Sequence, residues 1–336
     1  MATINDVAEK AGVSKGTVSA VLNNRKDGPI KVSPETWKKV LAAATELSYV
    51  PNTAAKGLRT GKTYLAGVIA GEIANSFASE ILDGIEDALN EKSYNIILVK
   101  NKDPHEISGK CRFLNEKKVD GLIVISNMYE NYAGYFDEIK FDKPTVFIAN
   151  NVKFPEAGSV SVAGAEIGFL AADHLIKLGH RNIAVAESRD SDRMEGIHEA
   201  FAKNKIRDPE IVMLKKYASF DDGRAALNEI VEKHPFVTAV IAHSDVVASG
   251  IIYEAREKGI NVPAQLSVVG TDNIEMAKML SPALTTVHQP KTEQGALAAG
   301  LLLEMLEGTS PRNIRLAPGM VVRESSTAPR KARTIS

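Results

Sequence analysis

Cysteine is nearly absent from this chain, because Cys111 is the single thiol among 336 residues. One thiol can form neither an internal disulfide nor a thiolate metal site, so both kinds of stabilisation are excluded. Long apolar runs are also missing, since no stretch approaches the roughly 20 residues that a membrane span needs. The first residues carry no basic segment followed by an apolar one, so no export signal is indicated. We therefore expect a cytoplasmic protein with no membrane partner.

Motifs of catalysis are missing as well. No G-x-G-x-x-G follows the first predicted strand, and no nucleophile elbow is present. The closest pair of histidines, His174 and His180, lacks the helical i,i+4 spacing of a metal site. Residues 57–63 resemble a phosphate-binding loop, but they have three residues between the glycines where that motif has four. They also precede a strand instead of opening a helix. The sequence predicts no enzyme, no metal and no cofactor.

Charge is close to balanced overall but unevenly distributed. The whole chain carries a net −1, whereas residues 1–62 hold ten lysines and arginines against five acidic residues. Residues 328–336 contain three basic residues and no acid, so the body between these segments is strongly acidic. A basic head on an acidic body is typical of a protein that binds nucleic acid and has a separate second function. A solvated surface can give a smaller split of this kind.

Residues 3–23 have the pattern of two short helices joined by a tight turn. Thr3 can cap the first helix, with Asp6 three residues later as in a capping box. Gly12 supplies the left-handed backbone that ends this helix, and Ser14 caps the next one. Each helix has an apolar inner face, formed by Ile4, Val7, Ala8, Ala11, Val18, Val21 and Leu22. Spacing alone is equally compatible with a small helical hairpin of another kind.

The outward face of the second helix is small, polar and basic near its start, which suits a recognition helix in a major groove. Lys15 and Thr17 are placed where side chains can reach base edges. Gly16 lies between them, has no side chain and permits close approach of the backbone to DNA. Ala20 can offer at most an apolar contact to a thymine methyl. We therefore expect much of the base discrimination to come from Lys15.

A third helix begins with a start signal at residues 33–35, where serine is the N-cap and proline takes the first helical position. Its apolar stripe can cover the first two helices. The loop before it, residues 24–32, contains Arg25 and two lysines. This loop can reach further phosphates or be a solvated insertion.

From residue 64 onward, apolar runs of strand length alternate with helical patterns. The predicted strands are 65–70, 95–99, 121–125, 145–149, 183–186, 239–242 and 266–270. The predicted helices are 78–91, 164–178, 193–204, 223–233, 244–258 and 292–306. This alternation predicts parallel sheets with helices on both faces, and the length of the body favours two similar lobes.

Three motifs taken together resemble the LacI/GalR family of bacterial transcriptional repressors. They read DVAEKAGVSKGTVSAVLN at residues 6–23, VSPETWKKVLAAATELSYVPN at 32–52 and AAKGL at 54–58. Later phrases similar to the family, such as SVVGTDN at 267–273, extend the resemblance over nearly the whole chain. It implies a small all-α helix-turn-helix DNA-binding domain followed by a two-lobed α/β domain of the periplasmic-binding-protein type.

The resemblance also implies a division of the chain. Residues 1–50 are expected to form the helix-turn-helix domain, and residues 51–62 a hinge helix and linker. Residues 63–327 are expected to form the effector-binding and dimerisation domain. Its two lobes would be 63–160 plus 289–317 and 161–288 plus 318–327, followed by the basic tail 328–336.

The resemblance further implies a homodimer that would present two heads to a pseudo-palindromic operator in double-stranded DNA. By the same resemblance, its hinge helix would enter the minor groove, with Leu58 wedged between base steps. The predicted DNA-binding residues are Thr3, Ser14, Lys15, Gly16, Thr17, Ala20, Asn23, Arg25, Asn52, Ala55 and Leu58. The chain departs from many relatives at Ala20, where they carry an arginine, so the operator of a familiar member cannot be assumed.

The effector site is expected where ligands of open α/β sheets bind, outside the carboxyl ends of the strands. Arg193 is the strongest candidate, because a guanidinium fork suits a sugar's hydroxyl pair or a carboxylate. An arginine near a helix start is usually a surface residue, but its family context, DRMEG at residues 192–196, favours ligand binding. Asp272 can accept hydrogen bonds from a ligand or cap a helix at residues 274–279.

Four further residues are weaker candidates for the effector site. Ser244 and Asp245 lie at the start of a predicted helix, where they can bind a ligand or act as caps. Phe77 can stack on a ligand ring or pack between the lobes. Gln289 lies where strands are expected to cross between the lobes.

The sequence therefore predicts a DNA-binding transcriptional regulator, a repressor whose operator affinity is controlled by a small molecule. A sugar or sugar derivative is the expected effector because most relatives respond to such ligands. A solute-binding protein would share the body but would need an export signal and no basic head. A sugar- or nucleotide-modifying enzyme would need a catalytic constellation that the sequence does not contain.

Overall fold

A computed structural model describes most of the chain and divides it into two compact units, Met1–Thr63 and Tyr64–Ser336. We call these units the head and the body and describe each by itself. The described residues are 2–22, 31–49, 61–71, 73, 76–101, 103–125, 142–148, 156–187, 192–213 and 219–329. Within these ranges, no helix has the length and apolar character needed to cross a membrane.

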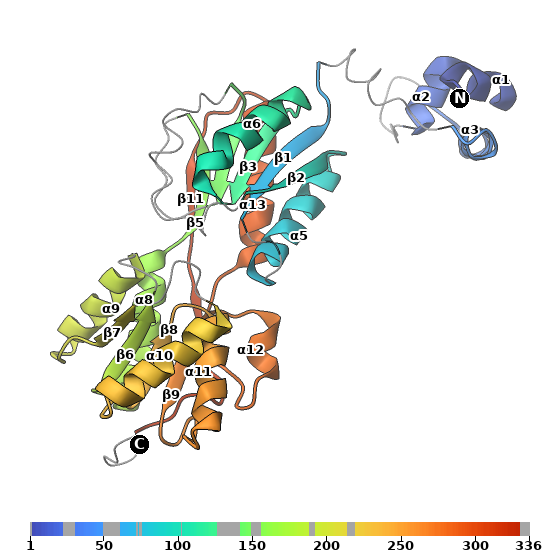
Figure 1. The fold of residues 1–336 in the computed structure, drawn as a ribbon. Helices are drawn as coiled ribbons and strands as arrows, with labels where there is room; N and C mark the ends of the chain where they lie inside the picture. The colour runs from blue at the N-terminus through green and yellow to red at the C-terminus, as the bar shows by residue number, and fades with distance from the viewer. Residues whose placement is uncertain are drawn as a thin grey trace. The chain divides into compact units, whose positions relative to one another are not determined.

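The described helices of the head are α1 (Ile4–Ala11), α2 (Lys15–Leu22) and α3 (Pro34–Glu46) (Figure 1). The predicted capping box is present, because Thr3 and Asp6 exchange backbone and side-chain hydrogen bonds. Gly12 ends α1 with a φ of 66°, in the left-handed region that glycine adopts most readily. Ser14 Oγ accepts the backbone N–H of Thr17 at 3.2 Å and so caps α2. Local sequence signals thus set both ends of α1 and the start of α2.

One apolar core holds the three helices of the head together. Its buried members are Val7, Ala8, Val18, Val21, Val40, Ala43 and Ala44. Val18 and Val21 belong to the inner face predicted for α2, while Val40, Ala43 and Ala44 are the residues that α3 contributes. The face of α2 that carries Lys15 is therefore left outside this core.

Two six-stranded sheets form the body. The first, sheet A, has the order β11 (Asn313–Leu316), β5 (Gly158–Val162), β4 (Thr145–Ile148), β3 (Gly121–Ile125), β1 (Leu65–Ala70) and β2 (Asn95–Lys100). The second, sheet B, has the order β12 (Gly319–Val321), β10 (Thr285–His288), β9 (Ser267–Asp272), β8 (Ala239–Ala242), β6 (Ile183–Glu187) and β7 (Glu210–Met213). The described pairings are parallel, except that β12 runs antiparallel to β10.

Helices cover both faces of each sheet, as the alternation of the sequence predicted. On sheet A they are α5 (Ser76–Asn90) and α13 (Lys291–Leu306) on one face and α6 (Ile107–Glu116) on the other. On sheet B they are α8 (Gly164–Leu178) and α9 (Asp192–Lys203) on one face, with α10 (Phe220–Lys233) and α11 (Asp245–Glu257) on the other. Figure 1 shows α13 beside α5, although the two helices come from opposite ends of the body's sequence. The described part of the body also contains two short helices, η1 (Pro104–Glu106) and α12 (Glu275–Met279).

We call the part of the body built on sheet A lobe 1 and the part built on sheet B lobe 2. The chain passes between the lobes after β5, after β10 and after β11. The change of lobe predicted after residue 160 falls inside β5, which continues in sheet A through Val162. Each sheet reverses its winding once, between β1 and β3 in sheet A and between β6 and β8 in sheet B. Such switch points are where open α/β sheets bind ligands.

The strands that the sequence did not reveal are short or polar. β5 reads GSVSV, β11 reads NIRL and β12 has three residues, so none forms a long apolar run. β7 and β10 were also not predicted. The helix α6 was not predicted either, and it has no side-chain cap that would mark its start in the sequence. The predicted strands at 65–70, 121–125 and 239–242 match β1, β3 and β8 at both ends.

Candidate functional site

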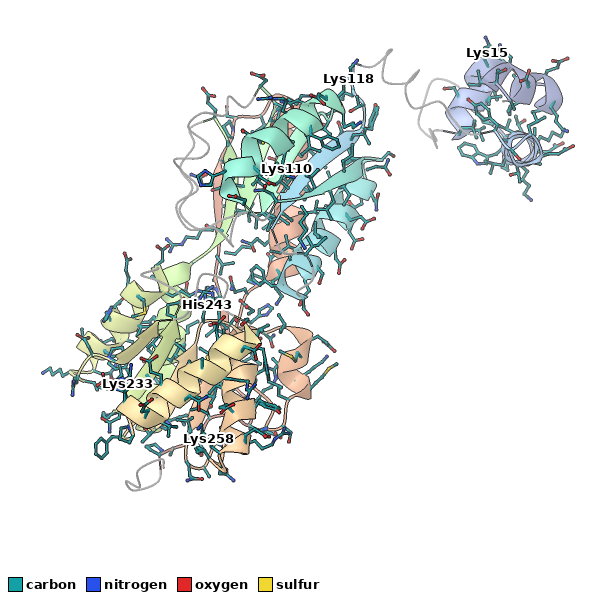
Figure 2. The ribbon with its side chains drawn as sticks, viewed as in Figure 1. Lys15, Lys110, Lys118, Lys233, His243 and Lys258 are labelled. Atoms are coloured by element: carbon teal, nitrogen blue, oxygen red, sulfur yellow. The ribbon has the colours of Figure 1, made fainter. Side chains whose placement is uncertain are left out.

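The outward face of α2 presents polar groups at its amino-terminal end. Ser14, Lys15 and Gly16 are exposed, and Figure 2 shows Lys15 at the surface of the head. Thr17 is half-buried, and its hydroxyl lies 3.0 Å from Ser14 Oγ, so part of its hydrogen-bonding capacity is used within the helix turn. Thr3 is exposed at the start of α1 and is likewise engaged in its capping box. Among the predicted DNA contacts that the structure describes, Lys15 therefore has the longest exposed side chain.

Ala20 is less exposed than a residue that contacts a base was predicted to be. Its exposed fraction is 6%, so its methyl offers almost no surface to a thymine methyl in the head as it is folded. Ala20 is thus buried like its neighbours Val18 and Val21, although it is not part of the apolar core of the head. The outward face of α2 is therefore shorter than the sequence suggested and is concentrated in the first turn. The other predicted DNA contacts, Asn23, Arg25, Asn52, Ala55 and Leu58, lie outside the described residues.

In the body, the carboxyl ends of the sheet B strands bring titratable groups together at the switch point. Glu187 ends β6, and His243 follows β8, the neighbouring strand. Glu187 is 3% exposed, and its Oε1 is hydrogen-bonded to His243 Nδ1. Figure 2 shows His243 at the edge of lobe 2, with Lys233 and Lys258 nearer the opposite end of the lobe. The sequence analysis missed this pair, because the two residues are far apart in the chain and belong to no motif.

Arg193 lies in the first turn of α9 and reaches the same edge. Its Nη1 donates a hydrogen bond to the backbone carbonyl of His243 at 2.7 Å. Its own backbone is packed closely on α8, because a Cβ added to Gly168 would lie 1.9 Å from the Arg193 carbonyl oxygen. The helix pair therefore fixes the guanidinium beside the end of β8, where its remaining N–H groups can serve a ligand.

Asp272 ends β9, the strand beside β8, and has its side chain at the same edge. Gln289 Nε2 donates to Asp272 Oδ1 at 2.7 Å, so these two predicted residues are brought together. Burial raises the pKa of Asp272, and the charges of Arg193, His243 and Lys291 oppose that rise. A carboxylate in this setting is a strong acceptor for a hydroxyl or amine of a ligand.

Asp245 also differs from its prediction as a ligand contact. It is fully buried, and it accepts the Thr286 hydroxyl at 2.5 Å and the Ile274 backbone N–H at 2.8 Å. Burial, together with the charge of Asp272, raises its pKa to about 7. Asp245 therefore anchors β10 and the start of α12 from inside lobe 2. Ser244 is half-buried and caps α11, since its Oγ accepts the Val247 N–H at 3.3 Å.

Phe77 occupies the second position of α5 in lobe 1. It is half-buried and packs against the core between sheet A and its helices α5 and α13. Its ring therefore contributes to the packing of lobe 1, and the exposed part of the ring remains a candidate for ligand stacking.

Comparison with known proteins matches two parts of the chain to protein families. Residues 3–52 match the family described as bacterial regulatory proteins, lacI family, and residues 172–326 match a periplasmic binding protein-like domain. The HTH-type transcriptional repressor PurR of Vibrio atlanticus is 35% identical over 314 residues, covering 91% of this chain and 92% of the relative.

Solved structures are similar over nearly the whole chain. A lac repressor dimer bound to operator and the anti-inducer ONPF has a TM-score of 0.80 at 26% identity, covering 97% of this chain and 99% of that one. The transcriptional regulator CelR in its cellobiose complex has a TM-score of 0.69 at 28% identity, covering 97% and 100%. Family, fold and head thus agree, and this chain belongs to the LacI family of DNA-binding transcription regulators.

Proposed function

We propose that the chain is a repressor that acts as a homodimer and loses or gains operator affinity when a small molecule binds at the carboxyl edge of sheet B. The observation that carries this proposal is the row of polar groups at that edge. Glu187, His243 and Asp272 end neighbouring strands at a topological switch point, and Arg193 reaches them from α9. No comparable row is needed for a DNA-binding head alone.

The chemistry of the row favours a polyhydroxylated ligand. A sugar hydroxyl both donates and accepts hydrogen bonds, so it can bridge a carboxylate such as Asp272 and a guanidinium such as Arg193. The row mixes two carboxyl groups with a guanidinium and an imidazole, and such a mixture of donors and acceptors suits the hydroxyls of a sugar better than the several negative charges of a phosphate. CelR, described in complex with cellobiose, is a relative with a sugar in its structure. We therefore infer a neutral carbohydrate or a close derivative.

The head would read one half-site of a two-fold operator with the first turn of α2. Lys15 supplies the main donor to base edges, and a second head in the dimer reads the other half-site. Effector binding changes operator affinity only if the ligand binds the two arrangements of the lobes with different affinity. A tenfold change in operator affinity corresponds to about 1.4 kcal/mol of coupling free energy.

A thermal-shift screen of sugars, sugar phosphates and purines tests this proposal, with Asp272→Asn as the matched variant. A ligand at 100 times its dissociation constant stabilises the native state by about 2.7 kcal/mol. We expect a sugar to raise the melting temperature of the wild-type protein and to leave that of Asp272→Asn unchanged. A response to purines alone would contradict the ligand class, and an equal sugar response in Asp272→Asn would contradict the site.

A further inference from the structure

Lys291 is the first residue of α13, at the point where the chain passes from lobe 2 to lobe 1, and its side chain is completely buried. Its Nζ donates to the backbone carbonyls of Asp272 at 2.6 Å and Asn273 at 3.3 Å. The same ammonium lies 3.3 Å from Glu80 Oε2. An ammonium has three N–H groups, and a buried one is tolerated only when they are satisfied. Two hydrogen bonds to backbone carbonyls and one ion pair thus surround the buried ammonium.

The two carbonyls belong to an unusual stretch of backbone. Asp272 has a φ of 111° and Asn273 a φ of 53°, and residues with a side chain seldom adopt positive values. Arg323 donates to Asn273 Oδ1 at 2.7 Å, and His288 Nδ1 lies 3.2 Å from Asn273 Nδ2. Lys291 neutralises the carbonyl dipoles that this conformation turns toward one point. It therefore helps to hold the segment that presents the Asp272 carboxylate.

The third contact of Lys291 leads into lobe 1. Glu80 lies on α5, and α5 packs on α13 with the two backbones in contact. A Cβ added to Gly84 would lie 2.0 Å from the Thr292 carbonyl oxygen, and one added to Gly295 would lie 2.1 Å from the Ile81 carbonyl oxygen. Helices packed this closely cannot shift against each other, so the α5 backbone at Glu80 stays fixed relative to the start of α13.

We propose that Lys291 is a positioning residue that transmits the occupancy of Asp272 in lobe 2 to helix α5 in lobe 1. The inference rests on the proposed function, since Asp272 reports on a ligand only if one binds there. A ligand that engages the Asp272 carboxylate changes the position of its backbone carbonyl relative to the ammonium. Because the ammonium is also tied to Glu80, the displacement passes to α5. The first element of lobe 1 is β1, which directly follows the segment that leads from the head.

Amide hydrogen exchange on the full-length protein tests this link without an effector or an operator. We compare the wild type with Glu80→Gln, Lys291→Met and the double variant, and use Lys278→Met as the control. Lys278 pairs with Glu275 at 2.7 Å on the exposed surface of α12, so its removal should change little. We expect Glu80→Gln, a change in lobe 1, to accelerate exchange at residues 272–274 in lobe 2 by about tenfold. The double variant should exchange there no faster than Lys291→Met alone.

Faster exchange confined to α5 in Glu80→Gln would overturn the proposal, because the effect would then be local packing. Additive acceleration of exchange at residues 272–274 by the two single variants would overturn it as well. If Lys291→Met does not fold, Glu80→Gln decides the question by itself. An Asp272→Asn variant that responds to sugars like the wild type would instead overturn the proposed effector site, and the exchange result would still report on the link.

Discussion

Two aspartates at the edge of sheet B have opposite roles, and the difference lies in their surroundings. Asp245 is fully buried and uses both oxygens for Thr286 and Ile274, whereas Asp272 shares one oxygen with Gln289 beside Arg193. Each lies near the junction of a strand and the next helix, Asp272 at the end of β9 and Asp245 at the start of α11, so the sequence is compatible with a ligand contact or a cap at both positions. Only tertiary packing shows that the Asp245 carboxylate is taken up by partners inside lobe 2, and for the same reason no sequence motif indicated His243.

Arg193→Ala should weaken effector binding and leave operator binding without effector nearly unchanged. Loss of a hydrogen bond to a charged group costs roughly 1.5–3 kcal/mol, which corresponds to about tenfold or more in dissociation constant. Calorimetric titration with the sugar found in the thermal-shift screen measures the change. His198→Ala on the same helix is the control, because the His198 side chain is 44% exposed and pairs with Asp208. An unchanged dissociation constant would remove Arg193 from the site.

Lys15→Ala should relax base preference at one or two positions of each half-site, at a cost of about 1–3 kcal/mol on the best sequence. A binding selection on randomised half-sites measures this preference. Lys39→Ala is the control, since Lys39 is exposed on α3 and pairs with Glu35 at 2.9 Å. If Lys15→Ala selects the wild-type sequence, the first turn of α2 does not read the bases.

At the scale of helices, the body is held by pairs that touch backbone to backbone. The pair α5 and α13 meets at Gly84 and Gly295, and α10 and α11 meet at Gly223 and Gly250, where an added Cβ would lie 2.1 Å or less from a carbonyl oxygen. Amphipathic patterns predicted these helices with ends correct to within a few residues. The patterns did not predict the pairing, because an apolar stripe shows that a helix is buried and not which helix it meets.

Gly295→Ala should destabilise the body by about 1–3 kcal/mol, because its Cβ would meet a backbone oxygen that cannot move aside. Gly300→Ala on the same helix is the matched control, since nothing lies within 4 Å of its Cβ. That variant should gain about 0.5–1 kcal/mol from the higher helix propensity of alanine. Urea unfolding of both variants measures the two changes. Equal effects would contradict the close packing of α5 on α13.

The C-terminal segment of the body is tied to sheet B through a buried imidazole. His180 Nε2 donates to the Thr327 carbonyl at 2.8 Å, and Nδ1 lies 2.8 Å from the Thr238 hydroxyl. Burial lowers the pKa of His180, so the native state binds a proton less readily than the unfolded chain. The contribution of His180 to the free energy of unfolding is therefore complete above the ordinary histidine pKa of about 6.5. This contribution is lost as pH falls through the lowered pKa of the native state.

His180→Gln should accordingly be less stable than the wild type by about 1–3 kcal/mol at pH 7.5. The difference in free energy of unfolding between the two proteins should be smaller at pH 5.5, because the wild type loses stability there and glutamine does not titrate. Chemical unfolding at the two pH values measures both gaps. A gap that stays constant or widens on acidification would contradict a neutral buried imidazole at this position.

For the whole molecule, motif and alternation together predicted a helix-turn-helix head and two α/β lobes. The order of strands was not predictable, because two strands near the end of the chain add to different sheets. β11 forms an edge of sheet A and β12 forms an edge of sheet B. The site likewise combines side chains from β6, β8, β9 and α9 with Gln289 beyond β10. What the sequence could not show is which of these distant residues converge, since convergence depends on the winding of sheet B.

Operator affinity in the presence and absence of the sugar, measured for the wild type and Asp272→Asn, tests the central claim most directly. Asparagine keeps the acceptor for Gln289 and tolerates the positive φ of this position, so the fold should persist. We predict that the sugar changes the operator dissociation constant of the wild type by roughly tenfold or more. Asp272→Asn should bind the operator with the wild-type dissociation constant and show no change with sugar. A sugar-dependent change in Asp272→Asn equal to that of the wild type would contradict control of DNA binding through this site.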